Sequence, residues 1–458
     1  MSILNNALSG AIASQVALGA ASQNLANLQT KGYTRQAALL AAVAPSYGGA
    51  NQAGNGVSVT SLFRFSDGYK TQQLWRSASE LGSYAQTQPY LTQLEQVLSD
   101  DDSSISDGVD EFFKALNAVA GEPLSTPVRQ QVVIAGNVLA QRFNSMNNVF
   151  NGQLQSIRQQ RGAIVDDANT AIAAIAALNT QISAAHAGGT NVSALIDARD
   201  QAIDSLSGLM KLQVNDQPDG TRNVSLASGQ ALVLGGVGGK LSVGAGVDQT
   251  FSLSFAGSTF DLDPTRMGGQ MGGLSNYLQD TLLPTQQGVA DLAQQLSSKI
   301  NAQLAAGTTM DGNPGKPMFV YTPGSVSNML QVADGYQTSD LAFSSSVAAG
   351  PGDTGNLNKL LDIKNQPITV TRVGAVLLGD ADTQLVGKLA VDSQLNKGAL
   401  TTAQTLRDQA NADWQSTSGV NEDEEAVNLV EYQKMYNANL KVISIANSLF
   451  DATLAMMG

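Results

Sequence analysis

The side chains that could do chemistry in this sequence are few, and none stands in a complete catalytic arrangement. The 458 residues hold a single histidine, His186. A Ser-His-Asp triad would need this histidine buried and oriented beside a nucleophile, and the chain carries no G-x-S-x-G motif. His186 stands at the polar end of a long apolar-periodic stretch, beside Gly188 and Gly189. A surface histidine is therefore the favoured interpretation.

Carboxylates could act in pairs, as they do in glycosidases. Asp107, Asp110 and Glu111 form one such group, and Glu424 with Glu425 forms another. Both groups stand where helices are expected to begin, and negative charge there is stabilised by the helix dipole. We therefore favour a structural role for these carboxylates over a catalytic one.

Three further stretches have partial features of ligand sites. Residues 99–106 (SDDDSSIS) could hold a cation, but such a run is more often a solvated loop that caps the next helix. Residues 235–239 (GGVGG) lack the GK[ST] ending of a phosphate loop and precede a strand pattern, which favours a hairpin turn. Residues 311–313 lack the ligand spacing and the closing Glu of an EF-hand. We expect no metal, no cofactor and no enzymatic activity.

Composition narrows the class of protein further. The net charge of −13 argues against nucleic-acid binding. The absence of cysteine excludes disulfides and thiolate metal sites. No apolar run approaches the ~18 residues of a membrane span, and residues 1–15 lack the features of a Sec signal peptide. We expect two to four domains and a protein that is cytosolic or exported without a cleaved signal.

The elements that would position a functional surface are the two ends of the chain. Residues 421–458 begin with an acidic cluster and continue without proline. Apolar residues then recur at steps of three and four or their sum, with Gln433 and Asn447 in the two gaps, which is typical of a narrow coiled-coil seam. The seam comprises Leu429, Tyr436, Leu440, Ile443, Phe450, Leu454 and Met457.

Residues 3–28 predict a second helix with the same rhythm, closed by Gly32. The remaining positions are mostly Ala, Ser, Gly, Asn and Gln, which allow another helix to approach closely. An ordinary amphipathic helix that caps a globule is the alternative. The positions of this seam are Leu4, Leu8, Ala11, Leu18, Leu25 and Leu28, interrupted by Gln15 and Ser22.

Between the two ends, the sequence predicts an elongated, mainly α-helical rod with a small inserted antiparallel β domain. The Thr126–Pro127 pair predicts a helix start, and an apolar stripe continues from there to Gly188, about sixty residues or roughly 90 Å of helix. The period changes to two after Leu212. Extended chain is expected at 33–66, helices at 67–98, 106–120, 191–211, 273–306 and 383–417, and a turn-rich segment at 307–380.

The N-terminal segment resembles the signature of the bacterial flagellar axial proteins, in which an A-N-x-x-T-x-G-Y run follows the first helix. The residues that carry it are Ala26, Asn27, Thr30, Gly32 and Tyr33, followed by Arg35. Within these rod, hook and hook-associated proteins, the chain is most similar to the hook-associated protein 1 (FlgK) family. That similarity rests on residues 33–36 (YTRQ), 54–59 (GNGVSV), 418–421 (SGVN) and 449–451 (LFD).

The resemblance implies a structural role at the junction of hook and filament. The terminal helices would pair as a coiled coil, copies would form a ring, and the hook protein and a second hook-associated protein or the filament would be axial neighbours. Export would use the flagellar type III route to the extracellular flagellum, with a cytosolic chaperone on the C-terminal helix. The implied domains are a terminal coiled-coil assembly domain (1–35 and 421–458), a helical bundle (36–211 and 271–420) and an outer β domain (212–270).

Other functions stay open on the sequence alone. Another rod or hook protein would share the N-terminal signature. A flagellum-displayed adhesin could use the inserted β domain, and a carboxylate-based hydrolase could be carried on the same scaffold.

Overall fold

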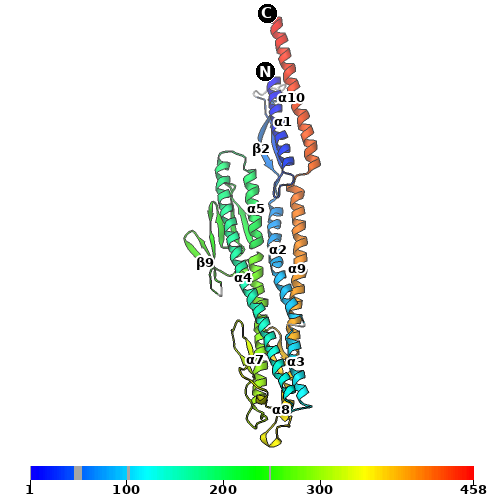
Figure 1. Ribbon diagram of the computed structural model, residues 1–458. Coiled ribbons are helices and arrows are strands. Elements are labelled where there is room, and N and C mark those ends of the chain that lie inside the picture. Colours follow the sequence, from blue (N-terminus) through cyan, green and yellow to red (C-terminus); the bar gives the residue numbers. More distant parts are fainter. Residues whose placement is uncertain (1, 46–53, 101–103, 247–248, 458) are drawn as a thin grey trace.

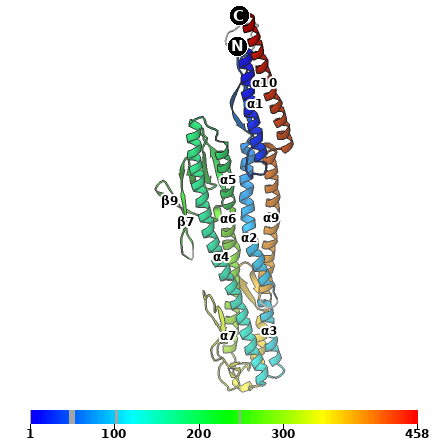
Figure 2. The ribbon, with the colours of Figure 1, turned by 45° about the horizontal axis from the view of Figure 1, so that its top comes forward.

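The computed structural model describes residues 2–45, 54–100, 104–246 and 249–457. The molecule is an elongated, mainly helical rod with small antiparallel sheets, and both chain ends lie at the same end of it (Figure 1). A narrower part made of the two terminal helices continues beyond a broader helical body, as the turned view also shows (Figure 2).

The terminal part pairs α1 (Ser2–Ala26) with α10 (Glu422–Met457). A hairpin of β1 (Gln36–Ala42) and β2 (Val57–Arg64) packs against α1 as well. The helix α1 ends at Ala26, two residues before its predicted end at residue 28. Gly32 comes after an intervening turn, where its φ of 80° suits glycine.

The helical body is built around α4 (Thr126–Ala187), which has 62 residues and is therefore about 93 Å long. This confirms the single long helix, although Ser125 and not Thr126 is its N-cap residue. The predicted stripe faces the core because apolar residues recur every three to four positions. This part also contains α2 (Gly68–Leu98), α3 (Ile105–Val119), α5 (Ser193–Leu209) and α9 (Ala381–Ser418).

The helical stretch expected at 273–306 has an irregular middle. It comprises α6 (Gly269–Asn276), a π-helical segment over Tyr277–Leu282, and α7 (Leu283–Ala305). Pro284 is the second residue of α7, one residue after the end of the π-helical segment. A proline has no amide hydrogen and its ring crowds the carbonyl four residues back, so a wider turn before it relieves the clash.

The strands of the inserted unit form two small antiparallel sheets. Residues 235–236 make the turn between β5 (Ala231–Leu234) and β6 (Val237–Gly238), with Gly235 at a φ of 55°, as expected for GGVGG. Gly236 lies so close to α4 that an added Cβ would come within 2.4 Å of Thr180 Oγ1. The first sheet has β3 (Leu212–Asp216), β4 (Arg222–Leu226), β5 (Ala231–Leu234) and β6 (Val237–Gly238). The second has β7 (Lys240–Val243), β8 (Phe251–Phe255) and β9 (Ser258–Leu262).

The turn-rich segment at the end of the rod far from the termini holds more regular structure than the sequence predicts. The short helix α8 (Gly355–Asp362) was not expected. Its buried side chains belong to only two turns, too few to produce a clear 3.6-residue period. The strands here are β10 (Phe319–Tyr321), β11 (Leu330–Val332), β12 (Pro367–Val370) and β13 (Gly374–Leu377).

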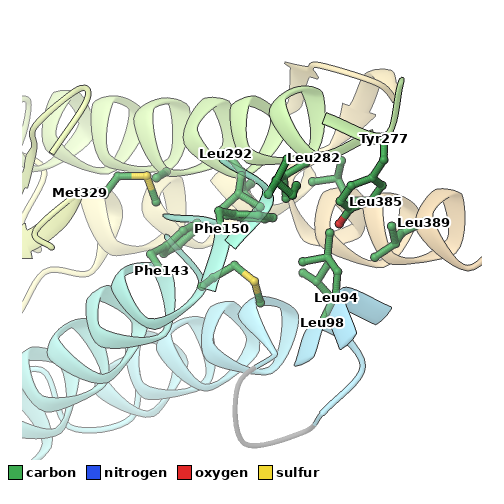
Figure 3. Packing of buried hydrophobic residues seen from close by; sticks show 14 of the residues in the cluster. Leu94, Leu98, Phe143, Phe150, Tyr277, Leu282, Leu292, Met329, Leu385 and Leu389 are labelled. Carbon is green, nitrogen blue, oxygen red and sulfur yellow. The ribbon is translucent and has the colours of Figure 1, made fainter. Parts of the chain in front are cut away.

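One contiguous hydrophobic cluster runs through the body, from α2 to α9, and includes side chains of both sheets of the inserted unit. Figure 3 shows part of it, where Phe143 and Phe150 of α4 lie near Leu292 of α7 and Leu385 of α9. Among the described residues, none of α1 or α10 belongs to this cluster. The terminal pair is therefore held by other contacts.

Amide side chains on the helices bind the backbone of the strands. In each case the side-chain oxygen accepts from the N–H of one strand residue, and the side-chain nitrogen donates to the carbonyl of that same residue. This satisfies both backbone groups where no neighbouring strand pairs with them; five of the six strand residues lie on edge strands, and Arg222 lies on β4, between β3 and β5. The pairs are Asn24 with Gln36, Asn144 with Leu330, Asn169 with Leu241, Asn179 with Arg222, Gln295 with Thr369, and Asn301 with Phe319.

Candidate assembly interface

The buried face of α1 consists of small residues and not of leucines. Gly10 lies close to α10, because a Cβ there would come within 2.6 Å of Asn439 Oδ1. Small side chains let two helix backbones come close together, and they also leave room for the hairpin on the other side of α1. The same 3–4 spacing that we assigned mainly to leucines also runs through these small residues, of which only Ala11 was part of the predicted seam. The buried positions include Ala7, Ala11, Ser14, Ala17, Ala21 and Asn24.

The N-terminal seam that the sequence predicts therefore points largely away from the core of the pair. Leu4 and Leu8 are exposed, and so is Ile12, which continues their line on the helix but was not predicted. Leu18 and Leu25 are half-buried, and Leu28 is half-buried in the turn beyond α1. Three large apolar side chains thus form an exposed stripe on the first half of α1.

The predicted C-terminal seam divides into two groups. Leu429, Tyr436 and Ile443 are half-buried and share a face with Asn439, which lies against α1. Leu440, Phe450 and Leu454 are exposed, and the side chain of Met457 lies outside the described part of the chain. Only part of the seam therefore serves the contact with α1.

Exposed apolar residues gather where the free ends of α1 and α10 lie side by side. Phe450 is 65% exposed and Leu449 is 61% exposed. A groove of about 730 Å³ runs between the two helices. Soluble proteins rarely leave contiguous apolar surface uncovered unless it meets a partner. The residues that line the groove include Ile3, Leu4, Val442, Ile445, Leu449 and Phe450.

The signature residues after α1 build the turn into β1. Asn27 and Thr30 bond to each other through side chain and backbone, and Ala26 is the exposed last residue of α1. The Tyr33 hydroxyl donates to Asn24 Oδ1 at 2.9 Å. Burial, followed by the nearby Asp197 carboxylate, raises the pKa of Tyr33 to about 12, so the hydroxyl remains a donor at neutral pH.

Arg35 closes this turn against the start of α10. Its guanidinium binds Glu425 and Glu424 at 2.6 and 2.8 Å. The acidic start of α10 is thus an ion-pairing site as well as a favourable charge at a helix N-terminus. Glu425 is 2% exposed, and it was not among the residues predicted for this interface.

The stretches weighed as chemical sites give no catalytic arrangement. His186 is exposed near the end of α4. Residues 101–103, which hold two of the three aspartates of the loop at 99–106, lie outside the described residues. In the described part of the chain, no three His, Cys, Asp or Glu side chains cluster closely enough to hold a metal ion. No helix in the same part combines the length and apolarity of a membrane span.

Comparison with known proteins agrees with this arrangement. A family model described as the helical domain of flagellar hook-associated protein FlgK matches residues 91–319, half of the chain. A second, described as the C-terminal part of the flagellar basal body rod FlgEFG protein, matches residues 414–456, which hold the end of α9 and α10.

Relatives that align over almost the whole chain, and one solved structure, agree with the family match. Flagellar hook-associated protein 1 of Salmonella typhimurium is 27% identical over 99% of both chains, and that of Escherichia coli is 25% identical over 99% of both. The structure of the flagellar hook junction protein FlgK from Burkholderia pseudomallei superposes with a TM-score of 0.67 at 17% identity. It covers 75% of this chain and 100% of that one, and it supports the fold.

The matching family is one of structural flagellar proteins and not of enzymes. The chain belongs to the FlgK family of flagellar hook-associated proteins.

Proposed function

We propose that the chain forms the layer that joins hook and filament, and that copies assemble through their paired terminal helices. The observation that carries this proposal is the exposed apolar surface at the free ends of α1 and α10. A large apolar surface that no described part of the chain covers favours a partner, and the family is one of structural flagellar proteins.

The proposed interface combines the exposed members of both predicted seams with surface that the sequence did not indicate. Leu4, Leu8, Leu440, Phe450 and Leu454 would contact neighbouring copies. Leu18, Leu25, Leu28, Leu429, Tyr436 and Ile443 would mainly support the pair from within, as their partial burial suggests. A contact between different surfaces of identical copies can close into a ring if its rotation closes.

The domain division follows from the same reasoning and is also a proposal. Residues 1–35 with 421–458 would be the assembly domain, and 36–211 with 271–420 the bundle that spaces it from the outer surface. The unit at 212–270 would face outward. The shared hydrophobic cluster suggests that this β unit is fused to the bundle and would not fold alone.

The proposed partners are the hook protein on one side and a second hook-associated protein or the filament on the other. Before assembly, a cytosolic chaperone would cover the last turns of α10, since an exposed apolar helix promotes aggregation. Export would follow the flagellar type III route. The lack of cysteine suits a chain that is exported unfolded, because no disulfide must be undone.

Deleting the gene tests the position of the layer. Cells should build hooks of normal length that carry no filament, and flagellin should accumulate in the medium, because the adaptor between the two tubes is missing. Electron microscopy of the cell surface and immunoblotting of the medium measure both effects. Loss of the hooks themselves would instead indicate a rod or hook protein.

Replacing Leu440 and Phe450 together by Asp tests the interface. Both side chains are exposed, so the isolated chain should keep its helical content while incorporation into flagella falls at least about tenfold, the effect of losing roughly 1.4 kcal/mol of contact free energy. The matched control replaces the exposed polar residues Asn437 and Ser444 by Asp, adding the same charge to the same helix. Equal incorporation of both variants would exclude this surface from the interface.

A further inference from the structure

A cleft between α2 and β3 lies on the helical body and has no part in the proposed interface. Its volume is about 530 Å³. One wall is the first half of α2, and the other is an outer strand of the inserted unit. The residues that line the cleft are Gln72, Trp75, Arg76 and Glu80 of α2, residues 211–215 in and just before β3, and Ala227.

The strand wall of this cleft is an unpaired sheet edge. β3 is the end strand of its sheet and pairs with β4 alone. Ala227 N–H donates to the Lys211 carbonyl, so every second residue from Lys211 onward turns its backbone groups toward β4. The backbone groups of Leu212 and Val214 therefore point away from the sheet, and they have no hydrogen-bond partner in the described part of the chain. Such an edge is able to pair with another strand.

The side chains around this edge offer further donors without partners. Trp75 is 6% exposed, and its indole N–H has no hydrogen-bond partner among the described residues, although a buried indole usually has one. Arg76 and Lys211 are exposed and form no ion pair within the same residues. Glu80 is the one carboxylate side chain of the lining. The cleft is thus net positive in a chain of net charge −13.

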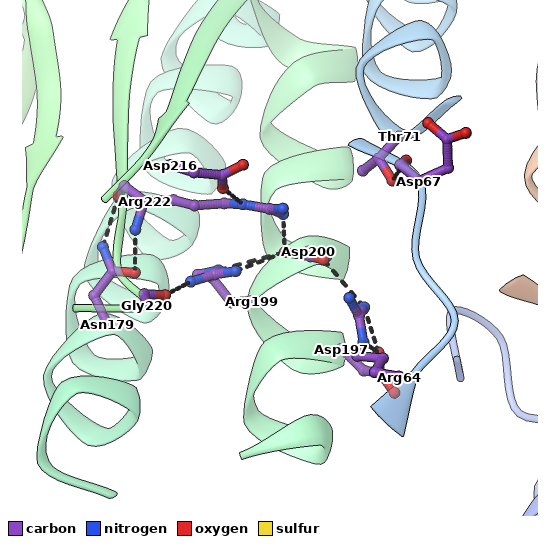
Figure 4. Close-up of polar contacts among 10 residues, drawn as sticks. All are labelled: Arg64, Asp67, Thr71, Asn179, Asp197, Arg199, Asp200, Asp216, Gly220 and Arg222. Atoms are coloured by element: carbon purple, nitrogen blue, oxygen red, sulfur yellow. Dashed lines mark hydrogen bonds and ion pairs between the residues drawn. The ribbon is translucent and has the colours of Figure 1, made fainter. Parts of the chain in front are cut away.

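Arg222 holds both walls of the cleft in place. Its guanidinium binds Asp216 on β3 and Asp200 on α5, and it lies 5.3 Å from the ring centroid of Trp75 on α2. Figure 4 shows Arg222 and Arg199 meeting at Asp200. A cleft whose walls are fixed beforehand loses little free energy to reorganisation when it binds a ligand.

We propose that this cleft binds an extended acidic segment of another protein, which adds to the edge of β3 as a further strand. The segment forms backbone hydrogen bonds with Leu212 and Val214. Its carboxylates bind Arg76 and Lys211. Five residues of strand span about 17 Å, the length of the edge that lines the cleft. The inference goes beyond the proposed function, because the cleft lies on the body and not on the α1–α10 surface.

Peptide binding to the full-length monomer tests the inference. The probes are two five-residue peptides with blocked ends, one in which Val alternates with Glu and one in which Val alternates with Lys. In a Trp414→Phe background, Trp75 is the remaining tryptophan of the chain, so its fluorescence reports on the cleft. The Glu peptide should bind saturably with a Kd below about 1 mM, and the Lys peptide should bind at least about tenfold more weakly.

Two sets of variants test the two kinds of contact. Arg76→Glu with Lys211→Glu should weaken binding of the Glu peptide at least about tenfold and strengthen binding of the Lys peptide, because the charge of the cleft is reversed. Val214→Pro removes an N–H that points away from β4, which an edge strand tolerates, and it should weaken binding of the Glu peptide to a similar extent. Val214→Thr is the matched control, since it keeps the N–H and should bind like the native chain.

Circular dichroism of each variant shows whether it keeps the native fold, and the charge-reversed variant decides alone if Val214→Pro does not fold. Equal binding of the two peptides, or no saturable binding of either, would overturn the inference. Self-association of the chain that is lost on charge reversal would also overturn it, because a second copy would then occupy the cleft. Filament attachment in cells that lack the gene would refute the proposed function and leave the peptide result unchanged.

Discussion

Asp382 shows how a single buried side chain can set the pH response of this fold. It lies in the first turn of α9 and is 3% exposed. Its Oδ2 accepts from Ser106 N–H at 2.9 Å, while Oδ1 has no hydrogen-bond partner. Burial raises the pKa of the Asp382 carboxyl to about 6. The contact joins the start of α9 to the start of α3, far from the termini.

We predict that Asp382→Asn removes a pH dependence of stability. Because the pKa is raised on folding, protonation stabilises the native chain fully below pH 3.8, and this contribution is lost as the pH rises through about 6. Between pH 7 and pH 4, the native chain should gain about 2.4 kcal/mol of unfolding free energy relative to the variant. Urea unfolding across this range measures the difference. A difference that stays constant with pH would contradict the assignment.

At the level of elements, helices and strands are joined by amide side chains. The two-stranded sheet of β10 and β11 illustrates this, since Asn301 of α7 binds the edge of β10 and Asn144 of α4 binds the edge of β11. Such bonds let short strands lie on long helices without exposing an edge that could pair with another chain. They also give a structural reason for the many asparagines and glutamines of this chain.

Asn179→Ala should destabilise the body by about 3 kcal/mol, because three backbone groups lose their partner in a buried site. Asn179 is fully buried, and it binds both backbone groups of Arg222 and the carbonyl of Gly235. Chemical denaturation measures the loss. The control is Asn137→Ala on the same helix, where the exposed amide bonds only to Val133 of its own turn. The role of the amide would be refuted if both variants were equally stable.

The sequence predicts the long elements well, because periodicity accumulates over many turns. The stripe through α4 and the change to period two after Leu212 are both confirmed. Interactions between distant residues leave no such period. Arg64 meets Asp197 across 133 positions, and no local pattern relates them. The face of α1 was misjudged for another reason: leucine and alanine stripes share one spacing, and only the partner helix decides which of them is buried.

On the scale of the whole molecule, the two parts differ in how they are held together. The body has one continuous core of large apolar side chains. The terminal pair buries mainly alanine, and each alanine contributes little hydrophobic free energy compared with a leucine or phenylalanine. Isolated helices owe most of their stability to tertiary packing. The terminal pair should therefore be the least stable part of the free chain and become fully stable only against neighbouring copies.

Limited proteolysis of the monomer tests this difference, because cleavage in a helix requires local unfolding. With a protease of broad specificity, residues 1–30 and 425–458 should be cut first, while 130–180 in α4 should resist until the body unfolds. Mass spectrometry of the fragments over time measures the order. In assembled flagella, which serve as the control, the terminal segments should become resistant, because neighbouring copies would cover Leu8, Phe450 and the groove between them. Equal resistance of all three segments in the monomer would mean that the terminal pair is stable alone. Assembly would then join rigid subunits and would not complete their folding.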